Sequence, residues 1–234
     1  MNIVLLEPSE VADGRVAFSG RRLDHIRMVL RAKVGDEIRV GVIGGAIGTG
    51  AVLSIGHDAV ELGVQLQQAP PPPLPLRVVL ALPRPKVFDR AIASLVSMGV
   101  RQIDLINAWR VEKSYWESPR LQADHLRQQA ILGLEQAGDT MLPEIRLHRL
   151  FTPFVTEELP SLIKGNLPLL SDPGASTPCP RSVNVPVTLV VGPEGGFIQR
   201  ELDTFAAIGF QPVSIGRRIL RVETALAYLV GRIF

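Results

Sequence analysis

The part of this 234-residue chain that decides its fold reads VTLVVGPEGGF, at residues 187–197. A short, continuous apolar run of this kind is typical of a strand that is buried on both faces of a parallel sheet. In the turn that follows, the glycines lack side chains and so allow a ligand to approach the backbone. Open α/β sheets usually bind ligands at the carboxyl ends of their strands. The stretch therefore predicts a parallel sheet with a binding loop at residues 192–197.

The rest of the C-terminal part alternates in the same way. We expect strands at residues 76–82, 103–106, 167–170, 187–191 and 212–215, and helices at residues 88–98, 121–137, 201–208 and 222–233. The helices are expected from apolar residues at helical spacing, and Gly99 and Gly138 stand where helices end. Alternation of strands and helices predicts an α/β domain whose parallel sheet is covered by helices.

The N-terminal part has a different pattern. Residues 38–40, 50–55 and 59–64 are rich in β-formers and are separated by glycine-containing turns. Such short strands with tight turns predict a small β-barrel. One helix is expected at residues 23–30, because Leu23, Ile26 and Leu30 recur at helical spacing. Basic side chains gather around this helix, namely Arg21, Arg22, Arg27, Arg31 and Lys33.

A proline run separates the two patterns. Residues 70–75 read PPPPLP. Proline has no amide donor and a fixed φ, so neither a helix nor a central strand can continue through such a run. We therefore expect an N-terminal β-barrel domain at residues 1–69, a semi-rigid linker at residues 70–75 and an α/β domain at residues 76–234.

Composition narrows the classes of protein. Hydrophobic residues make up 46% of the chain, which is far too many for a disordered protein, and the net charge is only +2. No apolar run approaches the about 20 residues that a membrane helix needs. The apolar residues at the start of the sequence are followed directly by Glu7 and Pro8, whereas a secretory signal has a longer apolar stretch. We expect a soluble, cytoplasmic protein without a membrane partner.

The sequence indicates neither a metal site nor a reactive cysteine. His57, His125 and His148 have no partners at metal-ligand spacing, so we expect no metal. The single cysteine, Cys179, stands between two prolines with no base beside it. We expect an inert thiol there.

A second glycine-containing turn follows the strand at 212–215. Residues 215–225 read IGRRILRVETA and open the last helix with three arginines and a Glu-Thr pair. Neither turn is a phosphate-binding P-loop, since no Lys-Ser/Thr follows the glycines, and neither matches the dinucleotide fingerprint G-x-G-x-x-G.

Together, residues 192–197 and 215–225 resemble the paired signature of the SPOUT-class methyltransferases. The chain is most similar to the bacterial 16S rRNA uridine-N3 methyltransferase family. Residues 25–31 and 34–36 resemble the family's N-terminal barrel, and residues 135–138 and 143–145 its central stretch. The resemblance therefore extends over nearly the whole chain.

The resemblance implies a fold, a reaction and partners. It implies a PUA-like, RNA-binding N-terminal barrel and a C-terminal SPOUT domain whose chain forms a trefoil knot. It also implies S-adenosyl-L-methionine as the cofactor and a homodimer as the active form. The expected reaction is methylation of N3 of one uridine in the 16S rRNA of the small ribosomal subunit.

Site residues are carried over onto matching positions. The resemblance implies cofactor contacts from Leu170, Ser171, Gly192, Pro193, Glu194, Gly195, Gly196, Ile215, Gly216, Ile219, Leu220, Thr224 and Ala225. RNA contacts are expected from Arg21, Arg22, His25, Arg27, Arg31 and Lys33.

The catalytic residues are predicted from the chemistry of uracil. N3 is a weak nucleophile while it is protonated, so a site that stabilises the developing anion is needed. Arginine can supply this stabilisation, which makes Arg221 the first candidate and Arg218 the second. Glu223 is a candidate base, and the alternative is that its carboxylate only complements the dipole of the last helix.

Four positions depart from the family pattern: Ser94, Ser97, Asp139 and Ile198. Ile198 stands where a serine usually caps the next helix, so another group is expected to cap it. Two alternatives remain open. One is a knotted methyltransferase for another RNA, acting on ribose 2′-O or on tRNA. The other is a non-catalytic RNA-binding factor in ribosome assembly.

Overall fold

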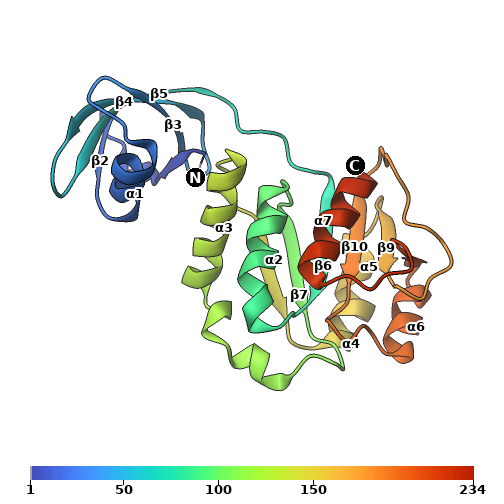
Figure 1. Cartoon of the computed structure of the whole chain (residues 1–234). Coiled ribbons are helices and arrows are strands. Elements are labelled where there is room, and N and C mark those ends of the chain that lie inside the picture. The colour runs from blue at the N-terminus through green and yellow to red at the C-terminus, as the bar shows by residue number, and fades with distance from the viewer. Residues whose placement is uncertain (1) are drawn as a thin grey trace. The chain divides into compact units, whose positions relative to one another are not determined.

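The computed structural model describes residues 2–234, and these form two compact units. The first unit is the chain up to Pro72 together with Ile131–Leu142, and the second is Pro73–Ala130 together with Pro143–Phe234. No element is assigned to Pro70–Pro73, in keeping with a run that has no amide donors. Figure 1 shows the elements of each unit along the chain.

The first unit contains a curled five-stranded sheet. Its strand order is β1 (Val4–Leu6), β3 (Glu37–Val42), β4 (Ile47–Ile55), β5 (Val60–Gln68) and β2 (Arg15–Phe18). β1 pairs with β3 in parallel, and the other neighbours are antiparallel. Alternate residues face a core that includes Val16, Val40 and Leu62. The strands expected at 38–40, 50–55 and 59–64 are therefore confirmed within β3, β4 and β5.

The helix expected at residues 23–30 differs in its winding. A short α1 (Arg21–Asp24) passes into one π-helical segment, His25–Leu30, which ends at Arg31 with φ +53°. Leu23 and Ile26 are buried in the core, but Leu30 is 45% exposed. The wider π turn rotates Leu30 away from the face that a 3.6-residue period predicts for it. The helix expected at residues 23–30 is thus present as α1 and this π-helical segment.

Ile131–Leu142 belongs to the first unit, where it bonds to Asn2 before β1 and to the turn between β3 and β4. The backbone N–H of Asn2 donates to the Glu135 carbonyl at 2.7 Å. The Thr140 hydroxyl donates to the carbonyl of Gly45 at 2.6 Å. The segment thus completes a unit whose other residues end at Pro72, a long-range pairing that no local pattern predicts.

The second unit contains a six-stranded sheet in which all neighbours are parallel. The order is β11 (Gln211–Val213), β9 (Leu167–Ser171), β10 (Val187–Val191), β6 (Leu76–Ala81), β7 (Gln102–Ile106) and β8 (Glu144–His148). Every residue of β6 and β10 is buried, so both faces of the sheet's centre are covered. The parallel sheet predicted from the sequence is confirmed.

Three longer helices belong to this unit, namely α2 (Pro85–Ser97), α6 (Gln199–Ala207) and the last element α7 (Val222–Ile233). A fourth, α3 (Ala123–Ala137), is divided between the two units after Ala130. α2 and α7 pack against each other in front of the sheet (Figure 1). Two short helices, α4 (Phe151–Pro153) and α5 (Leu159–Leu162), flank a π-helical segment at Phe154–Glu158. Among residues 2–234, none of the helices combines the length and the apolar character needed to cross a lipid bilayer.

Candidate functional site

Three loops of the second unit meet at one edge of its sheet. β9 and β10 end in register at Ser171 and Val191, and β11 lies beside β9. The chain leaves these strands through Asp172-Pro173, through the glycine-rich loop 192–197, and through the arginine-rich loop 214–221. These segments line a cleft of about 310 Å³ at the carboxyl edge of the sheet.

The cleft gathers most of the residues expected to bind the cofactor. Its lining includes Ser171, Gly192, Pro193, Glu194, Gly195, Gly196, Ile219, Leu220 and Ala225. Leu170 is buried inside β9, and Ile215, Gly216 and Thr224 lie in the same segments but outside this lining. The lining also includes residues that were not expected, namely Arg110, Asp172, Pro173, Val191, Phe197, Leu202 and Val222.

The glycine-rich loop needs glycine for two different reasons, backbone conformation at Gly196 and close packing at Gly192. Gly196 has φ +72°, a left-handed conformation that favours glycine. A Cβ on Gly192 would lie 3.2 Å from the ring of Phe197, closer than ordinary van der Waals contact. The loop therefore folds tightly around Phe197 and presents its backbone to the cleft.

Arg110 joins two loops by a hydrogen bond, and the sequence did not predict it as a site residue. It lies in the loop after β7, and its guanidinium Nη1 donates to the carbonyl of Gly195. Arg110 also lines the cleft. A cation thus stands beside the glycine-rich loop, although it comes from a segment 85 residues earlier in the chain.

Glu201 anchors the backbone at the start of α6. One carboxylate oxygen, Oε2, accepts from the backbone N–H of Ile198, the N-cap residue, at 2.9 Å. The other, Oε1, accepts from the backbone N–H of Trp109 at 2.7 Å. Glu201 is only 5% exposed, so both bonds form in a buried setting. The backbone N–H of Glu201, which a serine at position 198 could cap, bonds to the Ile198 carbonyl at 3.0 Å.

The predicted catalytic arginines lie on the surface of the third loop. Arg217, Arg218 and Arg221 are exposed, and Arg221 immediately precedes α7. Gly216 opens this loop with φ +126°. Ile219, which lines the cleft, is 81% exposed. The arginines are thus free to meet a ligand, and their catalytic role stays a prediction.

Glu223 has one buried oxygen without a partner. Its Oε1 lies 3.7 Å from Nη2 of Arg90 on α2. Its Oε2 is buried and has no hydrogen-bond partner among the described residues. The carboxylate stands in the first turn of α7, where the helix dipole favours negative charge. This position fits both the base and the dipole interpretation.

The other departures from the family pattern have local partners. The Ser97 hydroxyl donates to the carbonyl of Ser94 at 2.8 Å in the last turn of α2. The Asp139 Oδ1 accepts from the backbone N–H groups of Thr140 at 2.6 Å and Met141 at 3.1 Å. Asp139 is 5% exposed, so it fixes the turn after α3.

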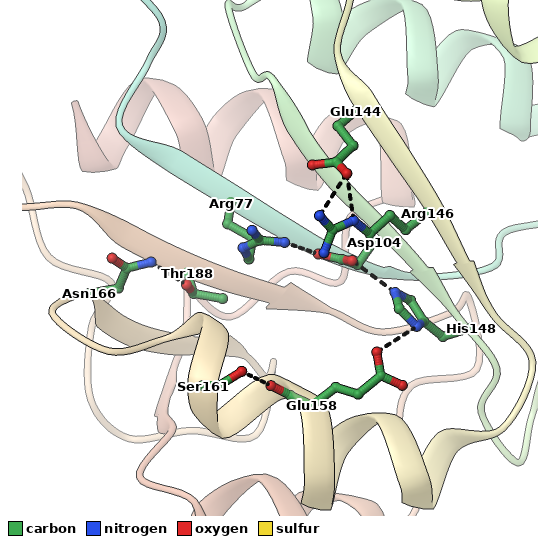
Figure 2. Close-up of polar contacts among 9 residues, drawn as sticks. All are labelled: Arg77, Asp104, Glu144, Arg146, His148, Glu158, Ser161, Asn166 and Thr188. Carbon is green, nitrogen blue, oxygen red and sulfur yellow. Dashed lines mark hydrogen bonds and ion pairs between the residues drawn. The ribbon is translucent and has the colours of Figure 1, made fainter.

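A charged cluster is buried in the sheet of the second unit. Figure 2 shows Asp104 of β7 between Arg77 of β6 and His148 of β8. Its carboxylate accepts from Arg77 at 2.6 Å and contacts Nε2 of His148 at 2.8 Å, and the His148 ring stacks on Phe154. The described residues hold no metal-binding group of three or more His, Cys, Asp or Glu side chains. The cluster is a structural ion pair inside the sheet.

The predicted RNA contacts of the first unit divide into paired and open cations. Arg21 forms a two-bond ion pair with Glu135 (2.6 and 2.9 Å), and Arg22 forms one with Glu10 (2.5 and 2.7 Å). The bond with Glu135 raises the pKa of Arg21, and the bond with Arg22 lowers the pKa of Glu10.

The remaining predicted contacts lie along the π-helical segment. Arg27 donates to the carbonyl of His57 at 3.2 Å, and Arg31 and Lys33 are exposed. His25 is partly buried and lines a cavity of about 410 Å³ in this unit. Arg27, Arg31 and Lys33 are therefore the cations best placed for phosphate contacts.

Comparison with known proteins finds one matching family and several similar named proteins. Residues 70–234 match the family described as RNA methyltransferase domain. Ribosomal RNA small subunit methyltransferase E of Treponema pallidum is 31% identical, over 96% of this chain and 87% of that protein. The protein of the same name from Synechocystis is 26% identical, over 98% of this chain and 76% of that one.

Solved structures share the fold. A ribosomal RNA small subunit methyltransferase E from Neisseria gonorrhoeae, bound to S-adenosyl methionine, matches with a TM-score of 0.73 at 21% identity, over 98% of this chain and 94% of that one. A methyltransferase from Legionella pneumophila in complex with the same cofactor matches with a TM-score of 0.72 at 23% identity, with the same coverage.

Proposed function

The chain belongs to the RNA methyltransferase domain family, as a relative of ribosomal RNA small subunit methyltransferase E, and on that premise we propose its complete reaction. It is an S-adenosylmethionine-dependent rRNA methyltransferase. It methylates N3 of a uridine in the 16S rRNA of the small ribosomal subunit, and the specific target is uridine 1498. The observation that carries the proposal is the cleft between two glycine turns at the carboxyl edge of a parallel sheet.

The residues of the cleft fit this cofactor. Its volume of about 310 Å³ lies within the range of small-molecule sites. Gly192, Gly195 and Gly196 offer backbone for polar contacts, while Ile219, Leu220 and Val222 offer apolar surface for a purine ring. When bound, S-adenosylmethionine supplies an electrophilic methyl group on a sulfonium centre.

The chain's own residues prepare the uracil. Arg221, with Arg218 beside it, stabilises the negative charge that develops on the uracil oxygens when N3 loses its proton. The N-terminus of α7 acts in the same direction. Glu223 accepts the N3 proton, or complements the helix dipole while water takes the proton. The N3 lone pair would then form a bond to the methyl carbon as the carbon–sulfur bond of the sulfonium breaks, and the neutral thioether would leave with that electron pair. Positioning of the uracil by the cleft supplies most of the remaining rate enhancement.

The first unit holds the RNA. Arg27, Arg31 and Lys33 contact phosphates, which orient an RNA without reading its sequence. This role agrees with a PUA-like, RNA-binding domain at residues 1–69. The target base has to leave its stack before N3 can reach the cleft.

The resemblance to the family supports two further proposals. We propose that the SPOUT domain expected at residues 76–234, after the linker at 70–75, carries a trefoil knot within the second unit. We also propose that two copies of the chain form the active enzyme. The position of β10 between β6 and β9, with the last helix α7 packed on α2, supports the first of these.

Ligand-dependent stabilisation tests the cofactor part of the proposal. Because a ligand that binds only the folded state stabilises it, saturating S-adenosylmethionine raises the Tm of the wild-type chain. Gly192→Val places a side chain against Phe197 and should remove the shift. Gly231→Ala, in α7 and outside the cleft lining, is the control for a glycine substitution, because an added Cβ there meets open space. Circular dichroism checks that both variants are folded, and a wild-type Tm that does not respond contradicts the proposal.

A further inference from the structure

Two tryptophans follow β7 and have opposite surroundings. Trp116 is 7% exposed, its Nε1–H donates to Oδ1 of Asn107 at 3.0 Å, and the guanidinium of Arg149 lies over its ring. Trp109 is 79% exposed. Tryptophan is highly buried on average, so an indole left in water is an informative exception.

The backbone beneath the Trp109 indole is fixed to the cofactor cleft. The Trp109 N–H donates to the buried carboxylate of Glu201 at 2.7 Å. The next residue, Arg110, lines the cleft and donates to the carbonyl of Gly195. The exposed indole is therefore held at the edge of the cleft by bonds on both sides, while its ring remains uncovered.

Cations and an aromatic ring occur together at this edge. Arg110 and the loop that carries Arg217, Arg218 and Arg221 border the same cleft through Arg110 and Ile219. Arginines attract phosphates, and a flat indole stacks on any nucleobase. Trp109 itself does not line the cleft, so its partner lies at the mouth and not at the reacting centre.

We propose that Trp109 is a positioning residue that stacks on an unpaired RNA base at the mouth of the cleft. The inference rests on the proposed function. Extracting the target base costs stacking energy in the RNA, and the indole offsets this cost by taking the place of a lost stacking neighbour. The stacked base also fixes the strand, so that N3 of the uracil is aligned with the cleft.

Three variants test the proposal. Trp109→Leu keeps an apolar side chain but removes the aromatic face, and Trp109→Phe keeps an aromatic face. Val185→Ala is the control, since it changes another exposed apolar residue, which precedes β10 at the opposite edge of the sheet. With small ribosomal subunits as substrate, Trp109→Leu should lower kcat/KM about ten- to hundredfold, the range expected for one base–aromatic stack. Trp109→Phe should recover most of it. S-adenosylmethionine affinity should stay unchanged in all three.

Tryptophan fluorescence gives a readout that a structural role would not move. A short RNA containing the target uridine should quench the wild-type emission, and Trp109→Phe should lose most of the quenching because the buried Trp116 remains. RNAs abasic at the target or at either neighbour identify the stacked base, since only one of them should abolish the quenching.

Three results would overturn the inference. They are equal kcat/KM for Trp109→Leu and wild type, quenching by every abasic RNA, or an indole already shielded from acrylamide in the free protein by a second copy of the chain. A wild-type protein that binds cofactor but methylates no subunit would contradict the proposed function instead. The two failures are therefore distinguishable.

Discussion

The Glu201 carboxylate accepts a hydrogen bond from the backbone N–H of Trp109 at 2.7 Å, across 92 residues of sequence. The same carboxylate also accepts from the backbone N–H of Ile198 at the start of α6. One buried side chain thereby joins the loop after β7 to the helix that follows the glycine-rich loop. The cleft depends on this connection, because Arg110 and Gly195 are its neighbours on either side.

Glu201→Gln should therefore weaken both the fold and the cleft. An amide in place of the carboxylate directs N–H groups at one of two backbone donors and leaves that donor unsatisfied. We expect a loss of about 1–3 kcal/mol in the free energy of unfolding, measured by urea denaturation, together with weaker cofactor binding. Asp203→Asn, on the exposed face of the same helix, is the control and should change neither. A stable Glu201→Gln variant with normal cofactor affinity would contradict this account.

A second prediction concerns the buried ion pair between Arg77 and Asp104 (Figure 2). Asp104→Asn leaves the buried Arg77 guanidinium without its counter-charge. Breaking a buried ion pair in this way typically costs about 3–5 kcal/mol. Glu144→Gln breaks the neighbouring pair with Arg146, which is about half exposed, and should cost less than about 1 kcal/mol. Equal losses for the two variants in urea denaturation would show that burial does not decide the difference.

The lowered pKa of Glu10 predicts that the stability of the first unit depends on pH. The hydrogen bond from Arg22 holds the pKa of Glu10 below its ordinary value of 4.5. A carboxyl group with a lowered folded-state pKa stabilises the fold above its unfolded pKa, and this contribution is lost as the pH falls through the folded pKa. Unfolding free energy measured from pH 7 to pH 3 should therefore fall less steeply in Glu10→Gln than in wild type. Parallel curves would count against the ion pair.

The open cations of the first unit should control RNA affinity and its salt dependence. Arg27→Ala and Arg31→Ala each remove one proposed phosphate contact, so each should weaken RNA binding and lower the slope of log affinity against log salt by about one. Filter binding at several salt concentrations measures both quantities. Cofactor affinity should not change, because neither residue lines the cleft. An unchanged salt slope would mean that these arginines do not meet phosphate.

The arginine loop should divide into catalytic and non-catalytic positions. Removing a group that stabilises developing negative charge costs about 10²–10³ in kcat, and we expect such a loss for Arg221→Ala. Arg217→Ala removes an exposed arginine of the same loop and should stay near wild type. Single-turnover methylation under saturating RNA separates the two. Equal losses of kcat in the two variants would mean that both arginines act only through general electrostatic attraction to the RNA.

Much of the second unit could be predicted from the sequence because its central strands are continuous apolar runs. β8 was missed, since Glu144–His148 has mostly exposed and polar residues that give an edge strand no apolar signature. The π-helical winding of residues 25–30 was not predicted, because nothing local distinguishes a π turn from an α turn. Arg110 was missed because it meets Gly195 only through the tertiary fold, and no spacing in the chain indicates such a contact.

The glycine-rich segments gave the site more readily. Tight turns after buried strands need glycine for reasons that are local, as the left-handed φ of Gly196 and the crowding at Gly192 show. The partners of Asp139 and Ile198 lie one to three residues away in the chain, so these are also local contacts. The second bond of Glu201, to the N–H of Trp109, depends on the tertiary fold and could not be predicted from spacing.

The most direct test follows the methyl group. The purified chain is incubated with methyl-labelled S-adenosylmethionine and small ribosomal subunits from cells that lack the activity, and the rRNA is then digested to nucleosides. The account predicts label in 3-methyluridine alone, at one site, and its loss in Arg221→Ala but not in Arg217→Ala. Label in a ribose-methylated or other nucleoside, or no label although the cofactor binds, would contradict it.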